Sequence, residues 1–260
     1  LAAGLGTRMK SSLPKVLHQV CGRPMISYVV AAALSLRPER LVVVTGADHD
    51  EVEALLPAGC ERAGQVERRG TGDAVRAGME PLVGFDGDVV VLVGDAPLID
   101  GAFLRELLTD HRRAGCLATV ATAVLEEPAH YGRIVRDADS GVERIVEARD
   151  ASPDQLDIAE VNTGFYVFDA HQLRGLLPRL QPTNAQGELY LTDVVHLMIG
   201  EGSAVAAHRT TDPGVMAAVN SRIELARVNA VMRERILERL MLSGVTVIDP
   251  ASTYVDFGVE

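Results

Sequence analysis

Two runs of apolar, mostly β-branched residues constrain the fold more than any other feature of this chain. The runs are LVVVTG (41–46) and VVVLVG (89–94), and neither alternates between apolar and polar positions. A strand with one face in water does alternate, so these runs predict strands that are buried on both faces. Such strands are typical of a parallel sheet with helices on each side.

The remaining apolar residues predict helices and further strands around these two runs. Helices are predicted over 25–36, 102–113 and 171–177, and short strands over 117–124, 132–135, 143–146 and 161–168. Strands interleaved with helices indicate an α/β fold with a Rossmann-like, mixed but mostly parallel sheet flanked by helices. The strands lie closer together between residues 132 and 168, which predicts a β-rich insertion.

The end of the sequence differs from the rest. Residues 220–242 predict a long amphipathic helix, with Ser221 and Glu224 as a capping-box pattern at its start and Gly244 as its stop. Residues 244–260 predict short β segments. We therefore expect a main domain over 1–243, which includes the linker helix 220–242, and a second part over 244–260.

Composition excludes several classes of protein. The chain has 260 residues, of which 47% are hydrophobic, so it can bury a sizeable core. It has no apolar run of roughly 20 residues and no signal-peptide pattern, so we expect a cytoplasmic protein without stable membrane insertion. Its three separated cysteines are expected to be thiols in a reducing cytosol. A net charge of −11 argues against nucleic acid as a partner.

The opening stretch LAAGLGTRM…LPK indicates a phosphate-binding loop. Gly4 and Gly6 begin a dinucleotide fingerprint, but Met9 stands where its third glycine belongs, and no Walker A pattern follows. A glycine-rich turn remains, with Arg8 and Lys15 as cations that can grip phosphate oxygens. The alternative is a surface turn with solvated charges.

Asp95 and Gln65 are further candidates for a binding site. Asp95 follows the second apolar run, at the sheet edge where open α/β sheets bind ligands, and its carboxylate could hold Mg²⁺ against phosphate oxygens. It could instead be a turn-forming residue before Pro97. The amide of Gln65 offers both a donor and an acceptor, as a uracil edge requires, although the GTG segment at 70–72 could also be an ordinary turn.

No pattern of residues indicates covalent catalysis. The seven histidines do not cluster at metal-ligand spacings, and no Ser–His–Asp or Cys–His arrangement is visible in the sequence. This fits a reaction without a covalent enzyme intermediate.

Several segments together carry a family resemblance. LAAGLGTRM…LPKVL resembles the signature of the sugar-nucleotide pyrophosphorylases. Later segments resemble, within that family, the N-terminal uridylyltransferase half of the bacterial bifunctional N-acetylglucosamine-1-phosphate uridylyltransferase/glucosamine-1-phosphate acetyltransferases. These segments, in chain order, are GTGDAV, GDAPLI, YGRIVR, IVEARDA, EVNTGFYVF, NAQGELYLTD and VNSRIEL.

The resemblance implies a role for particular residues. It makes Arg8 and Lys15 catalytic, and Asp95 and Asn220 the protein ligands of Mg²⁺. Asn220 could instead cap the helix that follows it, but Ser221 can do that. The implied substrate-binding residues are Leu1, Ala2, Ala3, Gly4, Gln65, Gly70 and Thr71 for uracil, Gly132, Glu147 and Asn162 for N-acetylglucosamine, and Lys15, Val93, Gly94, Asp95 and Asn220 near the phosphates.

The resemblance also implies a reaction. UTP and N-acetylglucosamine-1-phosphate would give UDP-N-acetylglucosamine and pyrophosphate, with Mg²⁺ as cofactor, in the synthesis of peptidoglycan and lipopolysaccharide precursors. One alternative is a relative that uses dTTP or glucose-1-phosphate. Another is a regulatory nucleotide-sugar-binding protein that has lost catalysis.

Both ends of the sequence depart from the family pattern. It starts at Leu1, where the family has the rest of its first strand, so we expect a trimmed record. Residues 244–260 resemble the beginning of a left-handed parallel β-helix, the family's acetyltransferase half. One partial coil cannot bury its own apolar face. Acetyl transfer is therefore expected to be absent, and a homotrimer is expected only with the missing β-helix.

Overall fold

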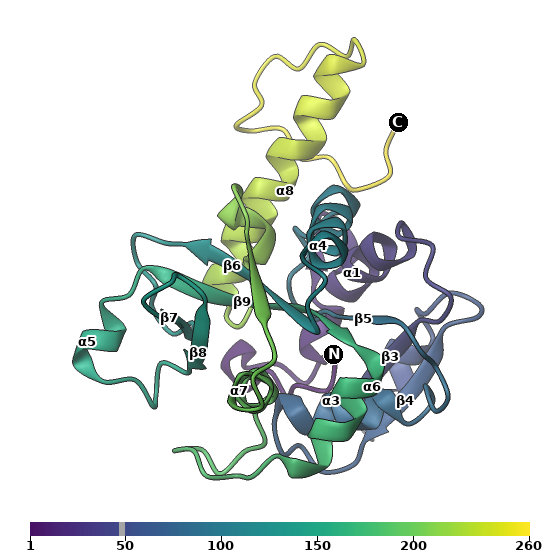
Figure 1. Cartoon of the computed structure of the whole chain (residues 1–260). Helices are drawn as coiled ribbons and strands as arrows, with labels where there is room; N and C mark the ends of the chain where they lie inside the picture. The colour runs from purple at the N-terminus through teal and green to yellow at the C-terminus, as the bar shows by residue number, and fades with distance from the viewer. Residues whose placement is uncertain (47–49) are drawn as a thin grey trace.

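The two apolar runs form strands that belong to different ladders. In this computed structural model, which describes residues 1–46 and 50–260, β3 (Val42–Gly46) pairs in parallel with β4 (Glu61–Gln65). β5 (Asp88–Val91) pairs with β9 (Glu160–Asp169) instead. The first two residues lie between them: the Ala2 amide donates to Val44 O at 2.7 Å, and the Gly94 amide donates to Leu1 O at 2.8 Å. The opening residues thus connect β3 to the segment after β5 (Figure 1).

The larger sheet has six strands and is mixed. Its order is β10 (Val205–Arg209), β6 (Ala118–Val124), β9, β7 (Arg133–Arg136) and β8 (Val142–Val146), with β5 on β9. Among its described pairings, β10 with β6 is parallel, whereas β9 is antiparallel to β5, β6 and β7. The prediction of a mixed sheet is confirmed, but the prediction that it is mostly parallel is wrong here. The chain returns from the insertion directly into the place beside β6, and an antiparallel return requires no crossover helix.

Helices cover both faces of this sheet. Phe165 and Val167 of β9 pack in one hydrophobic cluster with α1 and α4, whereas Tyr166 and Phe168 pack in another with α3, α6 and α7. Alternate residues of β9 therefore serve opposite cores, which explains why its sequence is largely apolar. The helices are α1 (Met25–Leu34), α3 (Thr71–Met79), α4 (Gly101–Ala114), α6 (Ala170–Leu176) and α7 (Thr192–Gly200).

Short elements complete the body of the molecule. The β7–β8 hairpin, at one end of the six-stranded sheet, forms a lobe with α5, which confirms the β-rich insertion (Figure 1). The short elements are η1 (Thr7–Met9), η2 (Lys15–Leu17), β1 (Gln19–Val20), β2 (Arg23–Pro24), α2 (Asp50–Glu53), α5 (Pro153–Leu156), η3 (Leu177–Arg179) and η4 (Pro213–Met216).

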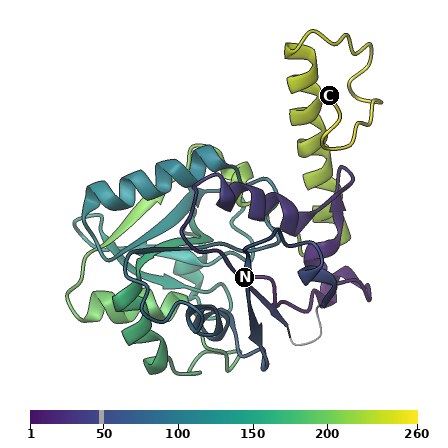
Figure 2. The same cartoon turned by 90° about the vertical axis from the view of Figure 1, so that its right-hand side faces the viewer.

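The long helix α8 (Arg222–Leu242) begins and ends as its sequence predicts. Ser221 is its N-cap, and the Ser221 hydroxyl accepts from the Glu224 amide at 3.3 Å. At the other end, Gly244 has φ +103° and donates to Met241 O, while Val245 donates to Leu240 O, as in a Schellman motif. The helix projects from the body (Figure 2). Although α8 has 21 residues, no helix in the described ranges is long and apolar enough to cross a membrane.

Residues 244–260 contain turns, and the structure describes no strand among them. The prediction of short β segments is therefore wrong for this chain, because a single coil has no neighbouring coil with which to pair. The last residues instead fold back as a strap, defined here as residues 254–259. The Phe257 amide donates to Cys21 O at 2.8 Å, and the Phe257 ring packs edge-on against Tyr28, with centroids 5.0 Å apart.

Candidate active site

Three predicted site residues from distant parts of the chain meet in one place. The ammonium of Lys15 forms an ion pair with the Asp95 carboxylate and donates to the Asn220 side-chain oxygen at 3.1 Å. Lys15 lies on η2, Asp95 follows β5, and Asn220 precedes α8. The side chains of Lys15 and Asp95 are each 13% exposed, so this cluster is largely shielded from water yet reachable from it.

The backbone around Asp95 and Asn220 fixes their mutual placement. The Val219 amide donates to Asp95 O at 2.9 Å, which joins the two segments directly. Ser221 caps α8, and the Glu224 carboxylate accepts from the Asn220 amide at 2.7 Å. The Asn220 side chain is therefore not used as the helix cap, as its neighbour Ser221 led us to expect, and it accepts from Lys15 instead.

The opening loop combines a glycine-dependent turn with backbone donors. Gly6 has φ +61°, and a Cβ built there would lie 2.6 Å from the Lys15 Cβ, so a side chain at this position would displace Lys15. Within the described residues, no acceptor bonds to the amides of Gly4, Leu5 or Gly6. Arg8 is exposed on η1 and has no hydrogen bond or ion pair with the described residues. The structure thus brings Lys15, but not Arg8, into the Asp95 cluster.

The oxygen atoms of this cluster suit a hard divalent cation. A carboxylate from Asp95 and an amide oxygen from Asn220 are the ligand types that Mg²⁺ prefers, and Lys15 already places positive charge between them. No group of three or more His, Cys, Asp or Glu side chains in the described ranges could hold a metal. A cation here would therefore take the remainder of its ligands from substrate and water, as Mg²⁺ commonly does in nucleotide sites.

The predicted uracil residues lie together at the ends of β3 and β4. Gln65, the last residue of β4, is paired with Gly46 of β3, and Ala2 forms a parallel bridge with the neighbouring Thr45. Gln65 is buried, and its Nε2 donates to Gly70 O at 3.0 Å. The Thr71 hydroxyl, in the first turn of α3, accepts from the Leu191 amide at 3.0 Å.

The loop after β4 also reaches the opening residues. Arg68 Nε donates to Ala3 O at 2.9 Å. The segments predicted to read the base, from residues 1–4 and from residues 65–71, are therefore in direct contact.

Val93 and Gly94 connect the opening loop to the sugar side of the site. Gly94 approaches Leu1 so closely that a Cβ on Gly94 would lie 3.0 Å from Leu1 O. A Cβ on Gly164 of β9 would lie 3.5 Å from the Val93 side chain. The segment before Asp95 is therefore packed between the first residues of the chain and β9.

The three predicted sugar residues also meet. The Asn162 amide donates to Gly132 O at 2.8 Å, and a Cβ on Gly132 would lie 3.4 Å from the Glu147 carboxylate. The Asn162 side chain donates to the Tyr166 hydroxyl at 2.6 Å and accepts from the Gly164 amide at 3.1 Å. The hairpin β7–β8 and strand β9 thus hold a glycine, a carboxylate and an amide side by side, a set that can recognise hydroxyl groups.

Acidic groups are concentrated near Glu147. Burial, and after it the negative charge of Asp150, raises the pKa of the Glu147 carboxyl above its ordinary value of 4.5, and Thr192 donates a hydrogen bond that opposes the shift. Burial likewise raises the pKa of Asp193, and His196 opposes that shift. These shifts indicate that the carboxyl groups of Glu147 and Asp193 are poorly hydrated. Hydroxyl groups of a ligand could form hydrogen bonds with them in place of water.

Sequence reasoning missed Tyr131. Burial raises the Tyr131 pKa, the charges of Glu224 and Asp95 raise it further, and the Ala218 backbone opposes the shift. Tyr131 therefore reaches from the sugar-side lobe to the Asp95 cluster. The only signal was its place in the YGRIVR segment, directly before Gly132.

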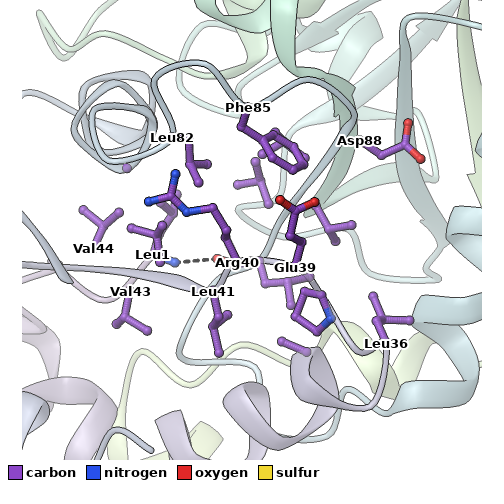
Figure 3. Close-up of a pocket in the computed structure, with 18 of the residues that line it drawn as sticks. Leu1, Leu36, Glu39, Arg40, Leu41, Val43, Val44, Leu82, Phe85 and Asp88 are labelled. Carbon is purple, nitrogen blue, oxygen red and sulfur yellow. Dashed lines mark hydrogen bonds between the residues drawn. The ribbon is translucent and has the colours of Figure 1, made fainter. Parts of the chain in front are cut away.

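An apolar cavity of about 500 Å³ lies away from these polar groups. It is bounded by β3, α3 and β5, with Val43, Val44, Leu82 and Phe85 among its lining residues (Figure 3). The dashed line in Figure 3 marks a hydrogen bond of 2.6 Å, which the backbone nitrogen of Leu1 donates to Leu92 O. Apolar side chains dominate its walls, although Arg37, Arg40 and Arg112 also line it, and its lining includes Leu1 and Gly94 but not Lys15, Asp95 or Asn220.

Comparisons with known proteins agree on one family. A family model described as MobA-like NTP transferase domain matches residues 1–155. The bifunctional protein GlmU of Pelotomaculum thermopropionicum is 48% identical over 98% of this chain and 56% of its own length. That of Streptomyces avermitilis is 47% identical over 100% of this chain and 55% of its own length. The chain thus spans little more than half the length of these relatives.

Solved structures agree on the fold. A UDP-glucose pyrophosphorylase complexed with UDP-glucose superposes with a TM-score of 0.73, at 18% identity, over 90% of this chain and 97% of the other. The apo form of a UDP-glucose pyrophosphorylase gives a TM-score of 0.74 at 17% identity, over the same shares of the two chains. At such low identity the likeness concerns the architecture: a mixed sheet flanked by helices.

Proposed function

The chain belongs to the family of MobA-like NTP transferase domains, and from this premise we propose that it transfers uridylyl groups from UTP to N-acetylglucosamine-1-phosphate. The products are UDP-N-acetylglucosamine and pyrophosphate. The similarity to GlmU proteins, 44–48% identity over nearly the whole chain, supports this substrate pair over dTTP or glucose-1-phosphate. The presence of both Lys15 and Asp95 argues against a regulatory protein without catalysis.

The observation that carries the proposal is the convergence of Lys15, Asp95 and Asn220. The sugar phosphate is already an anion at neutral pH, so its attack on UTP requires no general base. The reaction requires instead that two polyanions approach each other in line. A site with concentrated positive charge and fixed donors achieves this by positioning and electrostatics.

Each phosphate-binding group has a defined task in this proposal. The amides of the opening loop bind phosphate oxygens, Lys15 neutralises the α-phosphate, and the exposed fork of Arg8 binds the departing pyrophosphate. Asp95 and Asn220 would hold Mg²⁺, which would supply charge neutralisation between the two substrates. The ammonium of Lys15, which pairs with Asp95 in this structure, would pair with phosphate oxygens when the substrates bind.

Two recognition regions complete the proposed site. The base site is made by Gln65, Gly70 and Thr71 and by the backbone of residues 1–4. The sugar site is made by Gly132, Glu147 and Asn162. Val93 and Gly94 pack between the two regions, and Tyr131 closes the sugar side near Asp95.

The wider biology follows from the same reaction. We place it in the cytoplasm, where UTP is available, in the supply of precursors for peptidoglycan and lipopolysaccharide. Residues 1–243 would form the uridylyltransferase domain. Residues 244–260 would be the first partial coil of a left-handed β-helix, on which acetyl transfer and a homotrimer would depend.

A pyrophosphate-release assay tests the proposal. The purified chain is given UTP, CTP, dTTP or ATP, together with N-acetylglucosamine-1-phosphate or glucose-1-phosphate, with and without Mg²⁺. We expect turnover with UTP, N-acetylglucosamine-1-phosphate and Mg²⁺. Activity confined to another pair of substrates would refute the assignment.

Substitutions test the roles of the cluster. Asp95→Ala and Lys15→Ala are each expected to lower kcat by about three orders of magnitude, because Lys15 supplies a positive charge to the transition state and Asp95 would hold the cation that supplies another. Lys10, an exposed cation on the same loop, provides a matched control. Lys10→Ala should keep kcat within about twofold of wild type. A near-normal rate in folded Asp95→Ala would contradict its proposed role.

A further inference from the structure

A buried carboxylate beside the proposed base site has no part in the reaction described above. Asp73 lies in the first turn of α3 and is 7% exposed. One of its oxygens, Oδ2, accepts from Gln65 Nε2 at 2.9 Å, and the other, Oδ1, accepts from the guanidinium of Arg76. The carboxylate of Asp73 thus lies between Gln65, which is buried, and Arg76, which is half-exposed.

These contacts determine which way the Gln65 amide faces. A primary amide can turn over and exchange its oxygen with its nitrogen, and only its neighbours decide between the two orientations. Both neighbours of Gln65 Nε2, the Asp73 carboxylate and Gly70 O, are acceptors. Turning the amide would set its oxygen against two other oxygens in a buried place. Nε2 is therefore held toward these two acceptors, and Oε1 faces elsewhere.

The orientation of Gln65 has a consequence for base recognition. Within the described residues, no donor bonds to Gln65 Oε1, so this atom can accept a hydrogen bond from a ligand. Uracil carries a donor at N3 and an acceptor at O4, whereas cytosine carries an acceptor at N3 and a donor at its amino group. A fixed acceptor at Oε1 thus matches uracil N3–H and opposes cytosine N3.

We propose that Asp73 is a positioning residue that locks the Gln65 amide with its oxygen available to the base and thereby makes the site select uridine over cytidine nucleotides. This inference rests on the proposed function, because it requires the base to bind beside Gln65. Asp73 itself does not contact the substrate. It acts through Gln65 by way of Oδ2, and this contact does not depend on the contact of Oδ1 with Arg76.

The test compares UTP with CTP in the wild-type chain and in Asp73→Asn. Asparagine keeps the shape of the side chain but can present an N–H to Gln65, which allows the amide to turn over. We expect kcat/KM for UTP to fall about tenfold, mainly through KM, and the ratio of kcat/KM for UTP to that for CTP to fall by a similar factor. A merely structural role would lower both substrates equally and leave the ratio unchanged.

Arg76→Gln is the matched control. It removes the other partner of Asp73 but leaves the carboxylate facing Gln65, and the Arg76 side chain is 45% exposed. Its UTP-to-CTP ratio should stay within about twofold of wild type. A ratio that falls as far in Arg76→Gln as in Asp73→Asn would overturn the assignment to Asp73.

A second measurement needs no substitution. In the wild-type chain, the side-chain nitrogen of Gln65 is buried and donates to two acceptors, so its NMR signals should exchange slowly with solvent and persist when UTP is added. Fast exchange would overturn the inference even if Asp73→Asn failed to fold. Wild-type protein that selects UTP, together with an unchanged ratio in Asp73→Asn, would overturn this inference alone. Wild-type protein that does not use UTP would overturn the proposed function as well.

Discussion

At the scale of single residues, Lys15 lies between two partners that are 80 and 205 positions away in the sequence. The sequence predicted each of the three as a site residue, but assigned Lys15 to phosphate and the other two to a metal. Local patterns contain no information on which side chains pair when no ligand is bound. The contact itself arises from the meeting of η2, the loop after β5 and the start of α8.

Glu147 provides a prediction at the same scale. Its raised pKa means that the folded chain binds more protons than the unfolded chain near and above pH 4.5. The stability that protonated Glu147 contributes is therefore present below pH 4.5 and is lost as the pH rises through the raised pKa. In Glu147→Gln, the free energy of unfolding should fall less steeply than in wild type between pH 4.5 and neutrality. Urea denaturation at a series of pH values measures this.

Glu143 provides the comparison for that experiment. It lies on the same strand, β8, but its side chain is 50% exposed. Glu143→Gln should therefore follow the wild-type pH profile. Parallel profiles for wild type and Glu147→Gln would show that burial of Glu147 has no energetic consequence.

At the scale of elements, the sequence predicted the main helices and strands because their apolar periodicity is strong. Its prediction failed where strand direction depends on the partner, as for β9, and where a segment has no neighbour to pair with, as for residues 244–260. The strand β10 was not predicted at all. Its sequence, VAAHR, contains two alanines and two polar residues, so local propensity gives no strand signal.

The prediction at the scale of elements concerns Gly70, directly before α3. Gly70 has φ +109°, and a Cβ there would lie 2.6 Å from Leu189 O. Gly70→Ala should combine backbone strain with a collision against backbone, so we expect a loss of about 3 kcal/mol of unfolding free energy. It should also weaken UTP binding, because Gly70 O is one of the two groups that orient Gln65. Chemical denaturation and nucleotide titration measure the two effects.

Gly84→Ala is the control that separates the effect of backbone strain from the effect of the collision with Leu189. Gly84 also has a positive φ, +81°, but a Cβ there meets nothing within 4 Å. Gly84→Ala should cost about 1 kcal/mol and leave UTP binding unchanged. Equal losses of stability in the two variants would show that the approach of Leu189 to Gly70 is unimportant.

At the scale of the whole molecule, α8 connects the site to the end of the chain. Arg222 at its start donates to Met9 O in the opening loop, and Asn229 accepts from the Cys21 amide at 2.9 Å. The strap then returns to Cys21, and the Phe257 ring lies 4.7 Å from the Arg23 guanidinium in a cation–π contact. The segments before and after Lys15 thus both bind to α8, the helix that follows Asn220.

Substitution of Phe257 tests whether these contacts stabilise the fold. Phe257→Ala removes its ring contacts with Tyr28 and Arg23, so we expect a loss of about 1–2 kcal/mol and a lower Tm. Ile248, which lies in the same terminal segment and is 97% exposed, is the control. Ile248→Ala should leave Tm unchanged. An unaltered Tm in Phe257→Ala would mean that the strap contributes nothing to stability.

The strap also marks a limit of sequence reasoning at this scale. Residues 244–260 resembled the beginning of another domain, and nothing in their sequence indicated the contacts that they make with the first 30 residues. Such a contact depends on where α8 points after Leu242, and that direction follows from how its buried residues, such as Met232 and Ile236, pack on the body. Long-range docking of this kind cannot be inferred from the local pattern of either segment.

The placement of the tyrosines in this architecture has an optical consequence. The chain contains five tyrosines and no tryptophan, so its ultraviolet emission comes from tyrosine without a stronger neighbour to mask it. Tyr131 lies next to the Asp95 cluster, whereas Tyr28 and Tyr254 each lie against an arginine near the chain's end. The molecule therefore has tyrosines both beside the Asp95 cluster and beside the strap, so a change at either place is expected to alter its ultraviolet emission.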